Sequence, residues 1–346
     1  MGEGAMPNET GIRSALPPQE ENRKATWFEL FFDLVFVVSV AQLSGAYAHH
    51  YDLAGAAVFT GAFLAMWWCW LGHTFHATRF DRELPYQRML GFLQISAVAL
   101  VGYGATAPFS DRAWAFGGGL AAFKLLLAVA YQSERGWSGA AGLIRVYSGL
   151  YAAQAGLWAL GIVLPGPARF VVWGVALLLD LASPWLVARQ TTTVPPHPTH
   201  LPERFGLFTI ILLGEGMASV VHALDHGDPL HLSAVIAACL GAGLSFLLWM
   251  AYFQHVRGHG ERRIEDAVTG RRMRLWAYGH VPLYLGVASL AAGTVALATP
   301  GALSSLTIGL YIGGLSLAGA GLVLLGRVRP PASDARRAPG VGSLTE

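Results

Sequence analysis

Long apolar runs alternate with short polar segments along almost the whole chain. Each run holds about 20 residues, which is the length that an α-helix needs to cross a bilayer. The pattern therefore predicts an all-α, polytopic integral membrane protein with about ten transmembrane helices. The expected spans are residues 27–48, 54–76, 89–108, 113–132, 142–164, 168–187, 204–224, 231–253, 275–298 and 302–326.

The composition agrees with a chain that lies mostly in lipid. Hydrophobic residues make up 54% and charged residues 13% of the 346 residues, whereas about 25% of the residues in an ordinary soluble domain are charged. A net charge of +2 provides no basic surface for nucleic acid, so the lipid bilayer is the expected partner. The only two cysteines, Cys69 and Cys239, lie in apolar runs, which excludes a disulfide framework.

The positions of Lys and Arg predict the orientation in the cell membrane, because cytoplasmic loops collect positive charge. With a cytoplasmic N-terminus, all Lys and Arg residues fall on the cytoplasmic side except Arg112, Arg169 and Lys124, the last of which lies within a span. This asymmetry predicts an even number of spans and cytoplasmic N- and C-termini.

Three parts of the chain are expected. Residues 1–26 form a polar cytoplasmic segment without the pattern of a cleaved secretory signal, and residues 27–326 form the transmembrane domain. Residues 327–346 are rich in Pro, Ala and Arg, which predicts a disordered cytoplasmic tail.

Five ionisable side chains lie inside apolar runs and are the candidates for an ion, proton or substrate pathway. They are Glu29, Asp33, Lys124, Asp180 and Glu215. A charge near the bilayer centre costs about 2.5 to 3.5 kcal/mol, so such groups must face protein, water or a cation. We expect the acids of the first and seventh spans to share a hydrated cavity. The alternative is a structural ion pair, with Lys124 as the partner of one acid.

The first and seventh spans begin in a similar way. Glu29 and Phe31 match Glu203 and Phe205, and Glu203 with Arg204 forms a helix-entry motif that we interpret as an interface anchor. The stretch that ends at His73 also resembles the one that ends at His255. These matches indicate a possible parallel internal repeat of the first four and last four helices.

Histidines gather near the predicted outer face. His49 and His50 follow the first span, and His222 and His226 follow the seventh with the i, i+4 spacing that can hold a divalent metal. A solvated loop is the alternative interpretation. No other cofactor is predicted, since the chain contains no phosphate-binding loop, dinucleotide fingerprint or H-E-x-x-H motif.

Two acidic motifs carry a family resemblance. E-L-F-F-D-L-V-F from Glu29 and E-R-F-G-L-F-T-I-I-L-L-G-E from Glu203, together with H-V-P-L-Y-L-G from His280, resemble the bacterial low temperature requirement A (LtrA) family of membrane proteins. The resemblance covers roughly residues 25–328 and implies a multi-span membrane fold, but no particular reaction. Gly216 stands where a Ser is expected, which argues against a hydroxyl-dependent step there.

Three functions remain open. The favoured one is a transporter or channel that uses the intramembrane acids to move a proton, a cation or a small solute. The second is a membrane-embedded enzyme acting on a lipid or isoprenoid, with His73, His76, Asp81 or the His and Asp residues of the outer face as acid, base or metal ligands. The third is a non-catalytic scaffold or sensor in which the acids pair only with Lys124 and Arg145.

Overall fold

The computed structural model describes residues 23–80, 84–108, 111–225, 231–256, 261–299 and 303–328, together with residues 16 and 301. All regular elements within these residues are helices, which confirms the predicted all-α class. They are α1 (Trp27–His49), α2 (Leu53–Phe80), α3 (Pro85–Ala105), α4 (Ala113–Ser133), η1 (Ser138–Ala140), α5 (Ala141–Val163), α6 (Gly166–Leu186), α7 (Ala188–Thr193), α8 (His200–Asp225), α9 (Leu232–Ala251), η2 (Tyr252–Val256), α10 (Ala267–Ala298) and α11 (Ser305–Arg327).

Ten helices in the described part of the chain are long and apolar enough to cross a membrane, as the apolar runs predicted. Several extend beyond the apolar run that revealed them. α10 begins at Ala267, before the expected residue 275, because the Asp266 side chain accepts a hydrogen bond from the Thr269 backbone N–H and caps the helix. α8 begins at His200, one turn before the expected start at Arg204. The expected polar segment 1–26 and tail 327–346 lie almost entirely outside the described residues.

α1 begins where the sequence provides a capping box. The Thr26 hydroxyl accepts from the Glu29 backbone N–H at 3.3 Å, and the Thr26 N–H donates to Glu29 Oε2 at 2.8 Å. Such a cap stabilises a helix by about 1 kcal/mol. It also fixes the direction in which Glu29 and Asp33 leave the first two turns of α1.

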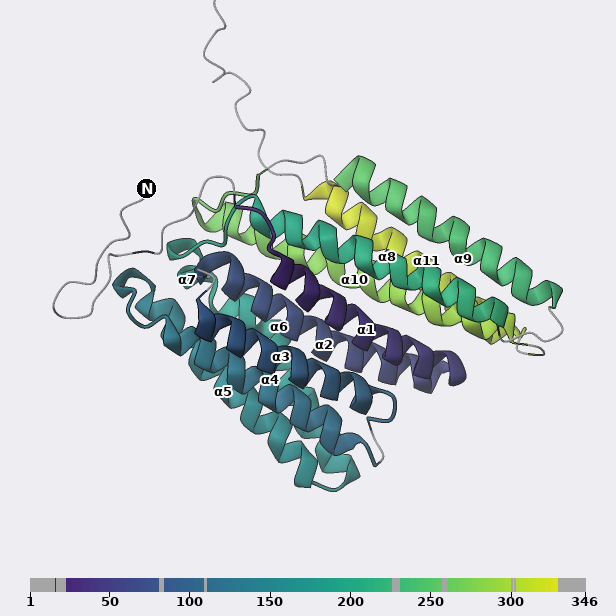
Figure 1. The fold of residues 1–346 in the computed structure, drawn as a ribbon, viewed down its shortest axis with the longest axis horizontal. Coiled ribbons are helices and arrows are strands. Elements are labelled where there is room, and N and C mark those ends of the chain that lie inside the picture. The colour runs from purple at the N-terminus through teal and green to yellow at the C-terminus, as the bar shows by residue number, and fades with distance from the viewer. Residues whose placement is uncertain are drawn as a thin grey trace, which may run out of the picture.

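The helices form two groups with α1 and α2 between them (Figure 1). The blue to teal helices α3 to α6 lie on one side, and the green to yellow helices α8 to α11 lie on the other. α1 packs against α2 and α3 as well as α8 and α10, so it joins the two groups. Similar pairings recur, since α1 contacts α3 and α3 contacts α4, while α8 contacts α10 and α10 contacts α11. The internal repeat itself stays a prediction.

α10 and α11 approach very closely through small residues. A Cβ added at Gly286 would lie 2.5 Å from the Ala318 nitrogen, and one added at Gly321 would lie 2.5 Å from the Leu283 nitrogen. Close backbone contact of this kind is typical of helix pairs in membranes. α10, which also contacts α1 and α8, is therefore packed closely against α11.

Candidate functional site

Asp33 lies at the centre of a buried ion cluster between α1 and α8. Its Oδ1 accepts hydrogen bonds from Arg204 Nη2 at 2.6 Å and from Trp70 Nε1 at 2.7 Å, and its Oδ2 accepts from Arg204 Nε at 3.1 Å. The Asp33 and Arg204 side chains are both fully buried. A two-pronged contact between a guanidinium and a carboxylate is among the strongest polar contacts in proteins.

Glu29 completes this cluster from the same face of α1. Its Oε1 lies 2.8 Å from Arg204 Nη1, and its Oε2 lies 3.1 Å from His200 Nε2. The Arg204 contact is not aligned as a hydrogen bond, so it is mainly a charge attraction. Because Glu29 and Asp33 are four residues apart, as are His200 and Arg204, each pair presents one face to the other helix. Glu29, Asp33, His200 and Arg204 are called the α1–α8 ion cluster below.

A second buried ion pair lies inside the other helix group. Lys124 Nζ on α4 lies 2.5 Å from Asp180 Oδ1 on α6, and both side chains are fully buried. Asp180 Oδ2 and both side-chain polar atoms of Gln154 have no hydrogen-bond partner among the described residues. Groups of this kind commonly hold an internal water. This pair contacts neither Asp33 nor Glu29.

Glu215 lies in a different place from the α1–α8 ion cluster. It is half-buried on α8, eleven residues after Arg204, which corresponds to about 16 Å along a helix. It lines a cavity of about 830 Å³ near the end of α1, called the end cavity. Other polar residues that line the end cavity include Gln42, His49, His50, Asp111, Arg112 and His222.

The expectation that acids of the first and seventh spans share one cavity is therefore wrong. Neither Asp33 nor Glu29 lines the end cavity, because Arg204 holds both acids at the opposite end of α1. The interface-anchor interpretation of Arg204 is also wrong, since its side chain is fully buried. Glu203 does lie at the helix entry, where its Oε2 accepts from the Ala25 backbone N–H at 3.3 Å.

A second cavity, of about 570 Å³, lies at the start of α1 and is called the start cavity. It is enclosed by the beginnings of α1 and α3 and by α2 and α4. Glu29 lines it, as do His73 and His76 of α2 and Gln94 of α3. His73 Nδ1 lies 2.8 Å from Gln94 Oε1, and His76 Nε2 lies 3.1 Å from the Ala130 carbonyl oxygen.

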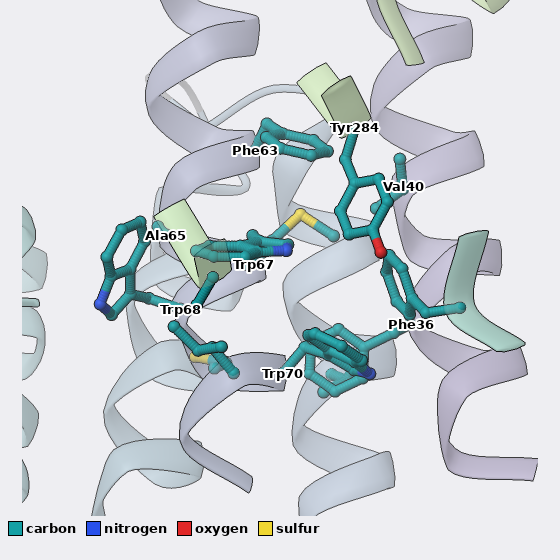
Figure 2. Close-up of a cluster of buried hydrophobic side chains, with 14 of the residues drawn as sticks. Phe36, Val40, Phe63, Ala65, Trp67, Trp68, Trp70 and Tyr284 are labelled. Carbon is teal, nitrogen blue, oxygen red and sulfur yellow. The ribbon is translucent and has the colours of Figure 1, made fainter. Parts of the chain in front are cut away.

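Four large buried side chains, Phe32, Phe36, Trp70 and Tyr284, are called the aromatic plug. Two of them, Phe32 and Phe36, lie on α1 between the residues that line the two cavities. Figure 2 shows Phe36, Trp70 and Tyr284 pointing toward one another from α1, α2 and α10. Phe32 stacks on His73 with 3.7 Å between the ring centroids, so the plug reaches the wall of the start cavity. The start cavity involves α1 up to Glu29, and the end cavity begins at Ala41, a separation of about 18 Å along the helix.

The histidines predicted to hold a metal are only partly described. His49, His50 and His222 line the end cavity, whereas His226 and Asp81 lie outside the described residues. Among the residues whose positions are given, no group of three or more His, Cys, Asp or Glu side chains could hold a metal ion. The divalent metal stays a prediction.

Sequence reasoning did not predict the contacts that three residues make in these sites: His200, Trp70 and Gln94. His200 could have been found, because it precedes Arg204 by the same four residues that separate Glu29 from Asp33. Trp70 and Gln94 carry no such signal. One tryptophan among several in α2, and one glutamine in an apolar run, look alike in sequence whether or not they meet a partner.

Comparison with known proteins adds the family. A family model described as Bacterial low temperature requirement A protein (LtrA) matches residues 24–344. A curated protein of Rhizobium meliloti (strain 1021), named Uncharacterized protein RA0937, is 27% identical over 322 residues, which cover 89% of this chain and 78% of that protein. No solved structure matches the chain.

Proposed function

We propose, since this chain belongs to the bacterial low temperature requirement A family and is a multi-pass membrane protein, that it moves a proton, a cation or a small solute across the cell membrane. In this proposal the start cavity faces the cytoplasm, the end cavity faces outward, and both termini are cytoplasmic. The pathway follows α1 from one cavity to the other.

The observation that carries the proposal is the pair of cavities at opposite ends of α1. Both are lined by polar side chains, and the stretch of α1 between them carries the buried Phe32 and Phe36. Polar cavities that reach into a membrane protein from both sides are costly unless water or a solute occupies them. A movement of α1 against α8 would open the space between the two cavities to one of them and close it to the other.

Glu215 is the best candidate for the group that exchanges a proton or cation. Its carboxylate lines the end cavity and makes no ion pair with another described residue. Asp33 and Glu29, by contrast, are both paired with Arg204. The transport proposal therefore depends on Glu215 and not on the acids of α1.

The α1–α8 ion cluster is proposed to hold the closed arrangement of the pathway. Removing one partner from a buried ion pair typically costs about 3 to 5 kcal/mol, so the cluster resists separation of α1 from α8. It joins α1, which lies between the two helix groups, to α8 of one group, and a transport cycle would have to move these two helices against each other. Lys124 and Asp180, which lie within one group, are proposed to stabilise that group.

Flux measurements in liposomes test the proposal. Purified protein is reconstituted in vesicles that contain a pH-sensitive dye, and proton or cation flux is followed after a gradient is imposed. We expect flux from the wild type, flux at the protein-free background from Glu215→Gln, and wild-type flux from Glu203→Gln, a matched change on the same helix. Absence of flux from the wild type, or equal flux from Glu215→Gln, would contradict the proposal.

A non-catalytic scaffold or sensor is the second candidate. The ion pairs of Asp33, Glu29 and Asp180 favour it, although the partner of the α1 acids is Arg204 and not the expected Arg145. The enzymatic alternative has less support, because His73 and His76 are each engaged by a neighbouring polar group. A folded wild type without flux would leave the scaffold as the better interpretation.

A further inference from the structure

Four arginines at the end of the molecule where α1 begins make no ion pair with another described residue. Arg145 lies near the start of α5, Arg189 lies in α7, and Arg271 and Arg274 lie near the start of α10. Residues 141–163, 181–199 and 267–298, which include these helix segments, contain no Asp, Glu or Lys. The four arginines, called the basic patch below, therefore carry a positive charge that no acid of their own segments balances.

α7 brings the arginines of α5 and α7 close together. A Cβ added at Gly142, at the start of α5, would lie 4.0 Å from Gln190 Cγ of α7. Arg145 follows Gly142 by three residues and so lies on the same face of α5. Arg145 and Arg189, which precedes Gln190, are both exposed. The two arginines therefore lie on neighbouring elements and are both open to a molecule from outside the chain.

Arg274 brings a third charge to this place, at the seam between the two helix groups. A Cβ added at Gly270 of α10 would lie 3.4 Å from Thr192 Cγ2 of α7 and 3.6 Å from Arg274 Nη1. The Arg274 Cζ also lies 5.0 Å from the centre of the Trp185 ring on α6. Tyr278, one turn later on α10, has its ring centroid 6.1 Å from that of Trp185. The Arg274 guanidinium is therefore held where α6, α7 and α10 meet.

The orientation of the protein does not by itself explain unpaired arginines. The positive-inside tendency places arginines on the cytoplasmic side but does not require them to be unpaired. Other arginines of this side are bound within the protein, since Arg262 Nη1 donates to the Val328 carbonyl oxygen at 3.1 Å and Arg263 pairs with Glu261 at 2.7 Å. Charge complementarity at the basic patch therefore favours a negatively charged group from outside the chain.

The surroundings of the basic patch fit a lipid better than a free anion. Trp185 is 44% exposed, and an exposed tryptophan at the end of a membrane helix is typical of the headgroup level. Val175 and Leu178, further along α6 into the span, are also exposed and can contact an acyl chain. The recess that Arg274 and Tyr147 line has a volume of only about 30 Å³, which is too small for a phosphate group. The headgroup must therefore lie over the outer edge of the Arg274 guanidinium.

We infer that the basic patch at the seam between α6 and α10 is a binding site for an anionic phospholipid of the cytoplasmic leaflet. The phosphate lies against Arg274 and Trp185, with Arg145 and Arg189 beside it, and an acyl chain lies along α6. Basic recesses between membrane helices on the cytoplasmic side are typical sites for such headgroups. The bound lipid connects the two helix groups at this end. The site goes beyond transport, because lipid binding requires no flux.

Native mass spectrometry of the detergent-solubilised protein tests the inference. Dioleoylphosphatidylglycerol and dioleoylphosphatidylcholine, which differ in net charge but have the same acyl chains, are titrated separately. We expect the first molecule of phosphatidylglycerol to bind about tenfold more tightly, because the basic patch attracts a headgroup with a net negative charge. Equal affinity for the two lipids would overturn the inference. Displacement of the bound lipid by an equal concentration of inorganic phosphate would also overturn it, because the site would then be one for a free anion.

A variant pair locates the lipid at the seam. Arg274→Gln removes one charge of the basic patch, and we expect about fivefold weaker binding of phosphatidylglycerol. Arg327→Gln, the matched control at the same end of the molecule on α11, should bind like the wild type. Equal weakening in the two variants would indicate a general effect of surface charge and would overturn the site.

Photocrosslinking locates the lipid in the wild type without a variant. Phosphatidylglycerol with a diazirine in one acyl chain is added to the protein in nanodiscs, and mass spectrometry identifies the labelled peptides. We expect labelling of residues 175–186. Labelling confined to other helices would overturn the site even if Arg274→Gln fails to fold.

Discussion

The carboxylates near the two ends of α1 have different surroundings. At its start, Glu29 and Asp33 are buried against Arg204, and Trp70 and His200 supply further polar contacts. At its end, Glu215 lines a polar cavity and makes no ion pair with another described residue. The role that a buried carboxylate can have therefore depends on whether it is paired. A paired acid holds helices together, whereas an unpaired acid beside a cavity can exchange a proton or a cation.

Replacing Arg204 should have the largest effect, and it tests whether the α1–α8 ion cluster holds these two helices together. Arg204→Met leaves two buried carboxylates without their guanidinium, and we expect a loss of about 3 to 5 kcal/mol in the free energy of unfolding. Reversible unfolding in mixed micelles measures this loss. Arg204→Lys should lose less, because it retains the charge but cannot contact both acids with a planar fork. A loss below about 1 kcal/mol for Arg204→Met, the range of an exposed ion pair, would show that the cluster does not hold the helices.

Replacing Lys124 and Asp180, singly and together, tests whether the protein needs this buried ion pair for stability. Lys124→Met and Asp180→Leu should each cost about 3 kcal/mol, because each leaves one uncompensated buried charge. The double variant should unfold much closer to the wild type. If the double variant loses as much as the two single variants together, then the pair is more than a self-contained structural contact.

Replacing Trp70 should have the smallest effect of the three, and it tests the hydrogen bond that Trp70 donates to Asp33. Trp70→Phe removes the indole N–H that donates to Asp33 Oδ1, and we expect a loss of about 1 to 3 kcal/mol in the free energy of unfolding. Trp67→Phe is the matched control, because its buried Nε1 has no hydrogen-bond partner among the described residues. Equal losses in the two variants would mean that packing, and not the Asp33 contact, explains the effect.

The membrane fold could be predicted because bilayer thickness sets the length of an apolar run. The ten spans follow from this single constraint, and the two acidic motifs led to the family. The limits of the helices were harder to predict, because caps and interfacial residues extend them. The start of α8 at His200 and not at Arg204 is the clearest case. Because of this earlier start, Arg204 lies in the second turn of α8 and not at the helix entry.

Lys124 was expected to pair with one of the acids and does pair with Asp180, whereas the partner of Asp33 and Glu29 could not be predicted from one sequence. Asp33 and Arg204 are 171 residues apart in the chain, and Arg145 and Lys124 were equally plausible partners by charge alone. The matching i, i+4 spacings of Glu29 with Asp33 and of His200 with Arg204 were a usable signal for which helix faces meet. The cavity around Gln94 gave no signal, since it depends on the packing of four helices.

Infrared titration of the carboxyl groups tests the difference between the two ends of α1 most directly. Difference spectra between about pH 4 and about pH 9 are recorded for the wild type, Glu215→Gln and Asp33→Asn, a range that covers the usual titration of carboxyl groups. We expect Glu215→Gln to lose a titrating carboxyl band and Asp33→Asn to lose none, because the Asp33 carboxylate is bound by the Arg204 guanidinium and by the Trp70 indole N–H. A band that disappears in Asp33→Asn and persists in Glu215→Gln would contradict the account.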